Sequence, residues 1–414
     1  MRVGLLSQWY DPEPGPAALP GGLARGLAQR GHDVQVVTGF PNYPTGKLAP
    51  GYRMSRRLDE VGDEGVRIRR VALYPSHDDS ALRRLANYGS FAASGVTFGT
   101  GALRGLDALW VSNSPISVSL PMWFVRYAHR VPVVLHVLDL WPDSVQASGF
   151  VGSGVAGGLL SRAMGGWCAA MYRCAAKVAY ISPGVGDLLA QRGVPEHKLV
   201  YIPMWANEPS GSAPRDLRAE LGLRDDQIAL VYAGTMGEAQ GLETLVDALA
   251  MVDDPRLVCL LAGSGVCEDR LRRQVDRHGL RNVRFLGRLP AEQMPALLQA
   301  GDAHVVSLRP TAMSPFTMPS KVQTILSAGR ALLVIADGDA AAVALSSSAG
   351  ISARPGDVNS IADAIRQTCQ LGREKLDLLG RYGKEYYERE FSLASGVRRV
   401  EDALRAASAT RGGR

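Results

Sequence analysis

Apolar residues along the chain gather in short runs that alternate with segments of helical spacing. In the first part of the chain, the runs at 3–6, 34–38, 66–71, 108–112, 131–137 and 177–181 predict buried strands, and the segments 23–30 and 80–103 predict helices. Strands that are separated by helices pair in parallel, because each connection has to cross the sheet before the next strand begins. This pattern predicts a doubly wound α/β domain.

A second series of apolar runs, at 228–232, 257–262, 283–286, 303–308 and 331–336, predicts further strands with helices between them. The Pro-, Ser- and Gly-rich segment 207–215 separates the two series and is typical of a linker between domains. The last segment, 381–407, is predicted to be helical with a break at Phe391 and Ser392. We therefore expect two α/β domains with a ligand cleft between them.

The segment 314–329, SPFTMPSKVQTILSAG, carries the strongest candidate chemistry. Pro319 and Ser320 suit the start of a helix, and the residues that follow give that helix one apolar face. The backbone N–H groups at a helix start attract anions, and Lys321 adds a full positive charge there. We interpret this segment as the seat of a diphosphate, and an ordinary capped surface helix is the alternative.

Two glycine-bearing loops and one carboxylate accompany this helix start. Gly21 and Gly22 precede the first predicted helix, where the backbone could approach a phosphate, although glycine serves a turn equally well. Asp139 follows the strand at 131–137, at the edge where open α/β sheets bind ligands. The loop 234–241 follows another strand and offers glycines, a hydroxyl and an amide to a phosphate, namely Gly234, Thr235, Gln240 and Gly241.

The charge of the chain is unevenly distributed. Residues 1–206 contain 20 Lys and Arg against 14 Asp and Glu, whereas residues 207–414 contain 26 of each, so the first part carries the whole net charge of +6. The basic residues are densest at Arg53, Arg56, Arg57, Arg67, Arg69, Arg70, Arg83 and Arg84. In the absence of a nucleic-acid motif, this density favours an anionic substrate or a membrane surface over DNA, and a plain solvated face is the alternative.

Several other patterns in the sequence do not predict a cofactor or metal site. The sequence 152–157 matches GxGxxG but does not directly follow a strand, and Asp337-Gly338-Asp339 precedes an alanine-rich segment where a helix cap is expected. Five cysteines without a CxxC pair, and histidines without ligand spacing, predict buried thiols and no metal site. We therefore expect a cytoplasmic protein without a metal, a cofactor or a nucleic-acid partner.

The motifs taken in order resemble the family-4 glycosyltransferases of the GT-B fold. They are GGLARGLAQRGHDVQVVT, FPNYPTG, DLWPDS, YAGTMGEAQGLETL and PSKVQTILSAG, and the resemblance extends from about residue 3 to about residue 395. More narrowly, these motifs resemble the branch of the family that builds bacterial O-antigen and colanic-acid-type polysaccharides, which includes suspected N-acetylfucosamine transferases. The resemblance implies two Rossmann-like domains: an acceptor domain at 1–206, to which a helix at 386–414 crosses back, and a nucleotide-sugar domain at 207–385.

The same resemblance implies a retaining, metal-independent transfer from a nucleotide-diphosphate sugar. It places Ser320, Lys321 and the loop 234–241 at the diphosphate, Arg288 and Leu289 beside the base, and Asp139 at the acceptor. This sequence departs from the family where two glutamates usually contact the sugar and the ribose, since these positions carry Phe316 and Thr324. It also lacks the Arg–Lys pair that is common in the loop 234–241, and Leu138 replaces the histidine of a His-Asp pair.

We therefore expect a retaining glycosyltransferase that moves a sugar from a UDP-sugar to a hydroxyl acceptor in glycan or natural-product biosynthesis. Lys321 is expected to stabilise the leaving diphosphate and Asp139 to orient the acceptor, with His136 as a candidate helper or a core residue. An N-acetylated or deoxy hexose fits Phe316. A lipid-linked acceptor and peripheral contact with the inner face of the membrane fit the basic first domain. The alternatives are a sugar-nucleotide epimerase or hydrolase of the same fold, and a non-catalytic sugar-nucleotide-binding subunit.

Overall fold

The structure is a computed structural model and describes residues 1–14, 19–77, 80–143, 155–206 and 216–410. The chain divides into two compact units, the first comprising Met1–Asn207 with Leu393–Arg414 and the second Glu208–Ser392. The break between them lies one residue beyond the predicted break at 206, and the return to the first unit lies at residue 393 instead of 386. The predicted linker at 207–215 lies outside the described residues.

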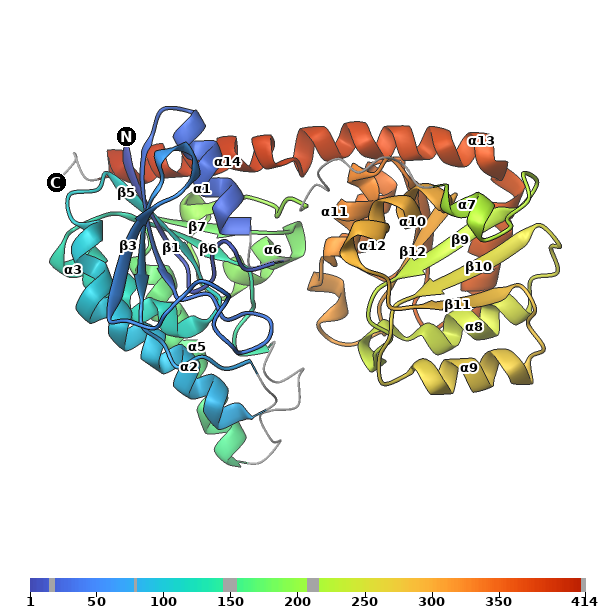
Figure 1. Ribbon diagram of the computed structural model, residues 1–414, viewed down its shortest axis with the longest axis horizontal. Coiled ribbons are helices and arrows are strands. Elements are labelled where there is room, and N and C mark those ends of the chain that lie inside the picture. Colours follow the sequence, from blue (N-terminus) through green and yellow to red (C-terminus); the bar gives the residue numbers. More distant parts are fainter. Residues whose placement is uncertain (15–18, 78–79, 144–154, 207–215, 411–414) are drawn as a thin grey trace. The chain divides into compact units, whose positions relative to one another are not determined.

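A sheet of eight strands forms the centre of the first unit, in the order β3-β4-β2-β1-β5-β6-β7-β8 (Figure 1). The strands are β1 (Arg2–Leu6), β2 (Asp33–Gly39), β3 (Arg57–Val61), β4 (Arg67–Val71), β5 (Ala108–Ser112), β6 (Val133–Val137), β7 (Lys177–Tyr180) and β8 (Leu199–Tyr201). The central strands β5 and β6 are buried along their whole length, which explains their continuous apolar sequence.

Helices cover both faces of this sheet. On one face lie α1 (Leu19–Gln29) and α14 (Leu393–Ala409), and on the other lie α2 (Ala81–Ser94), α3 (Ser119–Ala128) and α5 (Val155–Cys174) (Figure 1). The helix α6 (Pro183–Gln191) connects β7 to β8. The predicted single helix at 80–103 ends at Ser94 and continues as tighter and wider turns through Leu103. No described helix is both long and apolar enough to span a bilayer.

The sequence pattern missed the edge strand β3 and therefore predicted a purely parallel sheet. β3 pairs with β4 in the antiparallel direction, and its sequence RLDEV is too polar for the apolar runs that mark the other strands. Charged pairs across the two strands hold it in place, because Asp59 lies opposite Arg69 and accepts two hydrogen bonds from it at 2.6 and 2.9 Å.

The second unit has a parallel sheet of six strands in the order β11-β10-β9-β12-β13-β14. The strands are β9 (Ile228–Ala233), β10 (Leu257–Ala262), β11 (Val283–Gly287), β12 (Ala303–Ser307), β13 (Ala331–Ile335) and β14 (Gly350–Ala353). The helices are α7 (Leu217–Glu220), α8 (Leu242–Ala250), α9 (Glu268–Arg277), α10 (Met294–Ala300), α11 (Ser320–Ser327), α12 (Asp339–Ser346) and α13 (Val358–Glu390).

Alternate residues of β9 show how this sheet builds two cores. Leu230 and Tyr232 pack in one apolar cluster with α8, α9 and α13, whereas Ala229 and Val231 pack in a second cluster on the opposite face, with α10. Successive side chains of a strand point to opposite faces, so a strand that is buried on both faces has to be apolar throughout. Both units are therefore doubly wound, Rossmann-like α/β domains.

Candidate functional site

In the second unit, the loops that follow β9, β10 and β11 bind one another at the carboxyl edge of the sheet. The Gly234 N–H donates to the Ala262 carbonyl at 2.8 Å, and the Gly263 N–H donates to the Gly287 carbonyl at 2.7 Å. Glycine is required at 263, where φ is 132° and a Cβ would lie 1.9 Å from the Gly234 carbonyl oxygen. The loops are thus fixed relative to each other at the edge where α/β sheets bind ligands.

Lys321 extends from the first turn of α11 into this edge. Its ammonium donates a hydrogen bond to the Tyr232 hydroxyl at 2.8 Å and lies 4.0 Å from the centre of the Tyr232 ring. A Cβ on Gly234 would lie 2.4 Å from Nζ of Lys321, so this glycine leaves the space that the ammonium fills. The structure thus brings together two residues that the sequence singled out separately, Gly234 and Lys321.

Burial changes the acid–base behaviour of Lys321. Loss of hydration lowers its pKa from 10.5 to about 8, and no carboxylate in the described part of the chain forms an ion pair with it. An ammonium held in this way gains strongly from an incoming anion, because the anion restores the charge interaction that burial has removed. The arrangement can therefore bind a diphosphate at the start of α11.

Tyr232 is the functional candidate that sequence reasoning missed. It is the next-to-last residue of an apolar strand and is completely buried, so it looks like an ordinary core aromatic residue. Its hydroxyl accepts from Lys321 and donates to the Thr235 carbonyl at 2.5 Å, and it thereby connects the ammonium to the loop 234–241. The sequence did contain a signal for Tyr232, because a tyrosine near the end of a buried strand and two residues before a glycine loop lies close to the edge where ligands bind.

The other predicted residues of the loop 234–241 have internal roles. The side-chain oxygen of Gln240 accepts from the Gly237 N–H at 3.1 Å, so its amide stabilises the loop itself. Gly241 has a φ of 57° and joins a short turn to α8, which is the conformation that favours glycine. Thr235 is exposed. Contacts of these residues with a donor stay a prediction.

The remaining predicted donor residues lie at or near the carboxyl edge of the same sheet. Arg288 is exposed just after β11, whereas Leu289 packs partly against the cluster that includes α10. Phe316 is half-buried in a turn before α11, so it is not a core residue. Ser320 is exposed, and the Thr324 hydroxyl donates to the Ser320 carbonyl at 3.1 Å within α11.

In the first unit, Asp139 follows β6 and is held by two neighbours from the loop after β5. The Ser114 hydroxyl donates to its Oδ2 at 2.6 Å, and the Asn113 side-chain amide donates to its main-chain carbonyl at 2.8 Å. The Asn113 oxygen also accepts from the main-chain N–H groups of Leu138 and Asp139, at 2.8 and 3.2 Å. These bonds fix the direction of the Asp139 carboxylate.

The Asp139 carboxylate lines a cavity of about 270 Å³ at the carboxyl edge of the first sheet. Six of its fourteen lining residues are aromatic or histidine, namely Trp9, Tyr43, His77, Tyr88, Trp110 and Trp205. Small hydroxyls from Ser7, Ser112 and Ser114 supply further polar groups. Among the described residues that line it there is no lysine or arginine, so the cavity suits an uncharged polar ligand with apolar faces.

Two site predictions in the first unit, those for His136 and Gly21, need correction. His136 is completely buried, its Nε2 lies 2.9 Å from the Ile202 carbonyl, and burial lowers its pKa to about 4, so it is a core residue and not a catalytic helper. Gly21 lies inside α1, where a Cβ would be 2.1 Å from the Asp11 carboxylate, and a Cβ on Gly22 would contact Leu393 of α14. Packing therefore accounts for Gly21 without a phosphate, whereas the contact at Gly22 is an ordinary one and a phosphate contact of Gly22 stays a prediction.

Several arginines of the predicted basic face are buried or paired with carboxylates in the structure. Arg70 is 2 % exposed, and it donates to Glu60 at 2.7 Å and to the main-chain carbonyls of Gly39 and Asp11. Arg69 is bound to Asp59, and Arg67 donates to Asp33 at 2.6 Å. Arg67, Arg69 and Arg70 are therefore neutralised by carboxylates, and the pairs of Arg69 and Arg70 hold β3 and β4 together.

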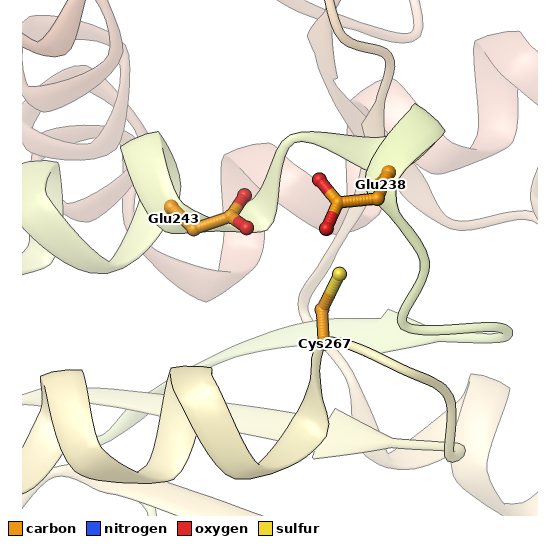
Figure 2. A group of neighbouring side chains, drawn as sticks. All are labelled: Glu238, Glu243 and Cys267. Atoms are coloured by element: carbon orange, nitrogen blue, oxygen red, sulfur yellow. The ribbon is translucent and has the colours of Figure 1, made fainter.

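One group of side chains has the composition of a metal site. Figure 2 shows Glu238, Glu243 and Cys267 converging from the loop 234–241, from α8 and from the turn before α9. Arginines already occupy both carboxylates: Arg270 pairs with each glutamate, and Arg309 pairs with Glu238 at 2.9 Å. Burial raises the pKa of the Cys267 thiol, which disfavours the thiolate that a metal needs. This group fits an arginine–carboxylate network better than a metal.

Of the two motifs that were set aside, only Asp337-Gly338-Asp339 lies wholly within the described residues. Residues 152–154 of the GxGxxG match lie outside the described residues. Asp339 begins α12, as expected for the start of a helix, but the residue at the N-cap is Gly338 with a φ of 67°. A Cβ on Gly338 would lie 2.0 Å from the Pro315 carbonyl oxygen, so α12 packs closely on the turn that carries Phe316.

Comparison with known proteins defines the class of this chain. The family described as "Glycosyl transferase 4-like domain" matches residues 15–205, and the family "Glycosyl transferases group 1" matches residues 215–386. The chain is 27 % identical over 421 residues to the Escherichia coli protein named "Putative colanic acid biosynthesis glycosyl transferase WcaI", covering 98 % of this chain and 100 % of that protein.

Solved structures show the same fold. Sucrose-phosphate synthase from Thermosynechococcus elongatus superposes with a TM-score of 0.69 at 19 % identity, over 99 % of both chains. HepE of Anabaena, in complex with UDP-glucose, superposes with a TM-score of 0.67 at 18 % identity, over 98 % of this chain and 100 % of that one. The two units therefore form a GT-B architecture. With its two matched domains, the chain belongs to the glycosyltransferases of the group 1, GT-B kind.

Proposed function

We propose that the protein is a retaining glycosyltransferase that transfers a sugar from a UDP-sugar to a hydroxyl of a saccharide acceptor in bacterial polysaccharide biosynthesis. The half-buried Lys321 supports this proposal most directly, because its ammonium lies without a carboxylate partner among the described residues, at a helix start and beside Gly234. Full-length similarity to a protein named for colanic acid biosynthesis supports the polysaccharide context.

In this proposal, Lys321 stabilises the negative charge that develops on the diphosphate as the bond to the sugar breaks. The first-turn N–H groups of α11 add the partial positive charge of a helix start. Such charge stabilisation is usually the largest single contribution to catalysis. The Tyr232 hydroxyl holds the ammonium in place, so Tyr232 is a positioning residue and Lys321 the group that contacts the donor.

The aromatic cavity of the first unit is the proposed acceptor site. Sugar rings present C–H faces that pack on aromatic side chains and hydroxyls that bind carboxylates. Asp139, fixed by Ser114 and Asn113, would orient the attacking hydroxyl. Because the described lining contains no lysine or arginine, we place an uncharged saccharide in the cavity, and the diphosphate of a lipid-linked acceptor outside it.

Our proposal for the donor sugar rests on Phe316, which stands where the family usually has a glutamate that contacts the sugar. A phenyl ring cannot accept hydrogen bonds from sugar hydroxyls, and an unpaired buried hydroxyl costs about 1–3 kcal/mol. The half-buried Phe316 would therefore favour a deoxy or N-acetylated hexose, N-acetylfucosamine included. UDP is the proposed nucleotide, and the complex of HepE with UDP-glucose shows that a protein of this fold binds such a donor.

Calorimetric titration with UDP-, GDP- and dTDP-sugars tests the donor proposal. We expect UDP-sugars to bind most tightly, and Lys321→Met to weaken binding of every nucleotide that carries a diphosphate. The exposed Lys375, on α13, provides the matched control, because Lys375→Ala removes a cation of the same unit outside the site. Equal binding by wild type and Lys321→Met would contradict the diphosphate assignment, and tighter binding of GDP or dTDP would contradict the choice of UDP.

The alternatives predict different turnover. An epimerase or hydrolase would consume the donor without any acceptor, and a non-catalytic subunit would bind the donor without turnover. Product analysis with a soluble saccharide acceptor separates them, and retention of the anomeric configuration in the product tests the retaining course. We propose that the protein acts in the cytoplasm, at the inner face of the membrane, where a lipid-linked acceptor would be presented.

A further inference from the structure

The outer side of α3 exposes a stripe of large apolar residues. Leu120, Phe124 and Tyr127 follow one another at spacings of four and three residues, so they share one face of the helix. Their exposed fractions are 40, 42 and 66 %. The opposite face of α3 is already buried in the first unit. A surface helix normally presents polar residues on its outer side, and an apolar stripe there indicates a second contact.

The neighbouring helices extend this surface. Trp123 of α3 and Trp167 of α5 have ring centres 5.3 Å apart, and the Trp167 indole N–H donates to the Ser119 hydroxyl at 2.8 Å, so the two helices lie side by side. α2 packs on α3 as well. Large apolar side chains are exposed on both neighbours, namely Leu82 and Leu85 on α2, and Leu159, Leu160 and Trp167 on α5.

The charge of this helical layer has one sign. The sequences of α2, α3 and α5 contain no aspartate or glutamate. They contain five arginines, namely Arg83, Arg84, Arg126, Arg162 and Arg173. The sequences of these three helices thus contribute positive charge alone, whereas the sequences of β3 and β4 together contain both signs.

A basic groove of about 810 Å³ lies where α3 and α5 end. Tyr127 of the apolar stripe lines it together with cationic side chains, namely Arg126, Arg130, Arg173, Lys177 and Lys198, and with His197. Among its described lining residues there is no carboxylate. The groove therefore joins an apolar surface to a site that suits a phosphate group.

Main-chain carbonyls, not acidic side chains, hold several of these cations. The Lys198 ammonium donates to the Arg173 and Ala175 carbonyls, both at 2.9 Å, and the Arg126 guanidinium donates to the Cys174 carbonyl at 3.2 Å. Burial, assisted by the charge of Arg126, lowers the pKa of Lys198. Carbonyls orient a cation without neutralising it, so these groups keep their charge for an external anion.

We propose that the outer side of α2, α3 and α5 docks on an anionic lipid bilayer, with the apolar stripe at the boundary of headgroups and acyl chains and a lipid phosphate in the basic groove. Apolar side chains next to cations are the combination that binds proteins to the surface of acidic membranes. A second copy of the chain fits less well, because a twofold dimer through this face would set its arginines against each other.

This inference deepens the proposed function, since a lipid-linked acceptor would be presented at the same membrane. It does not depend on turnover, so the two can fail separately. Loss of vesicle binding with intact glycosyl transfer to a soluble acceptor would overturn only the docking surface. Vesicle binding without any transfer would overturn only the proposed activity.

Sedimentation with vesicles of phosphatidylcholine, with and without phosphatidylglycerol, tests the docking surface. We expect binding only to the anionic vesicles, and weaker binding as salt is added. The double variants Phe124→Ser/Tyr127→Ser and Arg130→Glu/Arg173→Glu should each reduce the partition coefficient at least tenfold. The exposed Val266 and Arg277 of the second unit serve as matched controls, and Val266→Ser and Arg277→Glu should bind like wild type.

Three results would overturn the proposal. They are absence of binding to anionic vesicles, equal binding to neutral vesicles, and equal losses in the control variants. A concentration-dependent dimer in light scattering that Phe124→Ser/Tyr127→Ser abolishes would assign the face to a second copy of the chain instead. Circular dichroism of each variant separates loss of docking from loss of folding.

Discussion

Replacing Lys321 with methionine should make the protein more stable and less active at the same time. Methionine is nearly as long as lysine and carries no charge, so it can fill the same space beside Gly234. Burial lowers the pKa of Lys321 from 10.5 to about 8. One pKa unit corresponds to about 1.4 kcal/mol, so the charged side chain destabilises the folded state by about 3 kcal/mol at pH 7.

Part of this gain is offset in the variant. Methionine loses the hydrogen bond to the Tyr232 hydroxyl and the contact of the ammonium with the Tyr232 ring, which together contribute about 1–2 kcal/mol. We therefore expect the free energy of unfolding to rise by about 1–2 kcal/mol at pH 7. Turnover should fall about a hundredfold or more, as for the loss of one charge contact in a transition state.

The pH dependence isolates Lys321 from other groups. Between pH 8 and 10.5 the unfolded chain holds a proton on this lysine that the folded chain has released. The free energy of unfolding of wild type therefore rises with pH relative to that of the variant. The variant should be the more stable protein below pH 8, and its advantage should fall by about 3 kcal/mol up to pH 10.5, where wild type becomes the more stable protein because it keeps its contacts with Tyr232. Urea unfolding of both proteins across this range measures it. A variant less stable than wild type at pH 7, or a difference independent of pH, would refute the conclusion that the folded protein holds the Lys321 ammonium away from water and without a carboxylate partner.

The remaining predictions concern other parts of the molecule. Asp139→Asn should lower turnover without weakening donor binding, because the carboxylate lies in the cavity of the first unit; an unchanged rate would remove its role at the acceptor. Activity should survive EDTA, since arginines occupy the Glu238 and Glu243 carboxylates, and loss that manganese or magnesium restores would show a metal requirement. Phe316→Glu should shift kcat/KM toward UDP-glucose over an N-acetylated or 6-deoxy donor, and a wild-type preference for UDP-glucose would contradict the donor proposal. Arg70→Ala should destabilise the first unit by about 3 kcal/mol in urea unfolding, because it leaves Glu60 without its buried partner, and a stability like that of wild type would contradict the structural role.

The local sequence determined the class of fold. Apolar runs such as 131–137 and 228–232 are buried strands in the structure, and the predicted break at Phe391 and Ser392 separates α13 from α14. These features follow from periodicity and from the turn preferences of single residues, which act over a few positions along the chain. The polar strand β3 escaped detection for the same reason, because its place depends on its neighbour β4 and not on its own apolar content.

The sequence also indicated which residues carry charge at the carboxyl edges, among them Asp139 and Lys321. Only the tertiary structure decided their surroundings. Tyr232 and Lys321 are 89 positions apart, and their contact depends on the fold bringing the first turn of α11 to the end of β9. The same order of strands buried His136, neutralised Arg70 and left the groove beside Tyr127 without carboxylates among its described residues. Burial and pairing arise from segments that meet only after folding, so they control the pKa and the availability of a side chain in ways that its position in the sequence does not reveal.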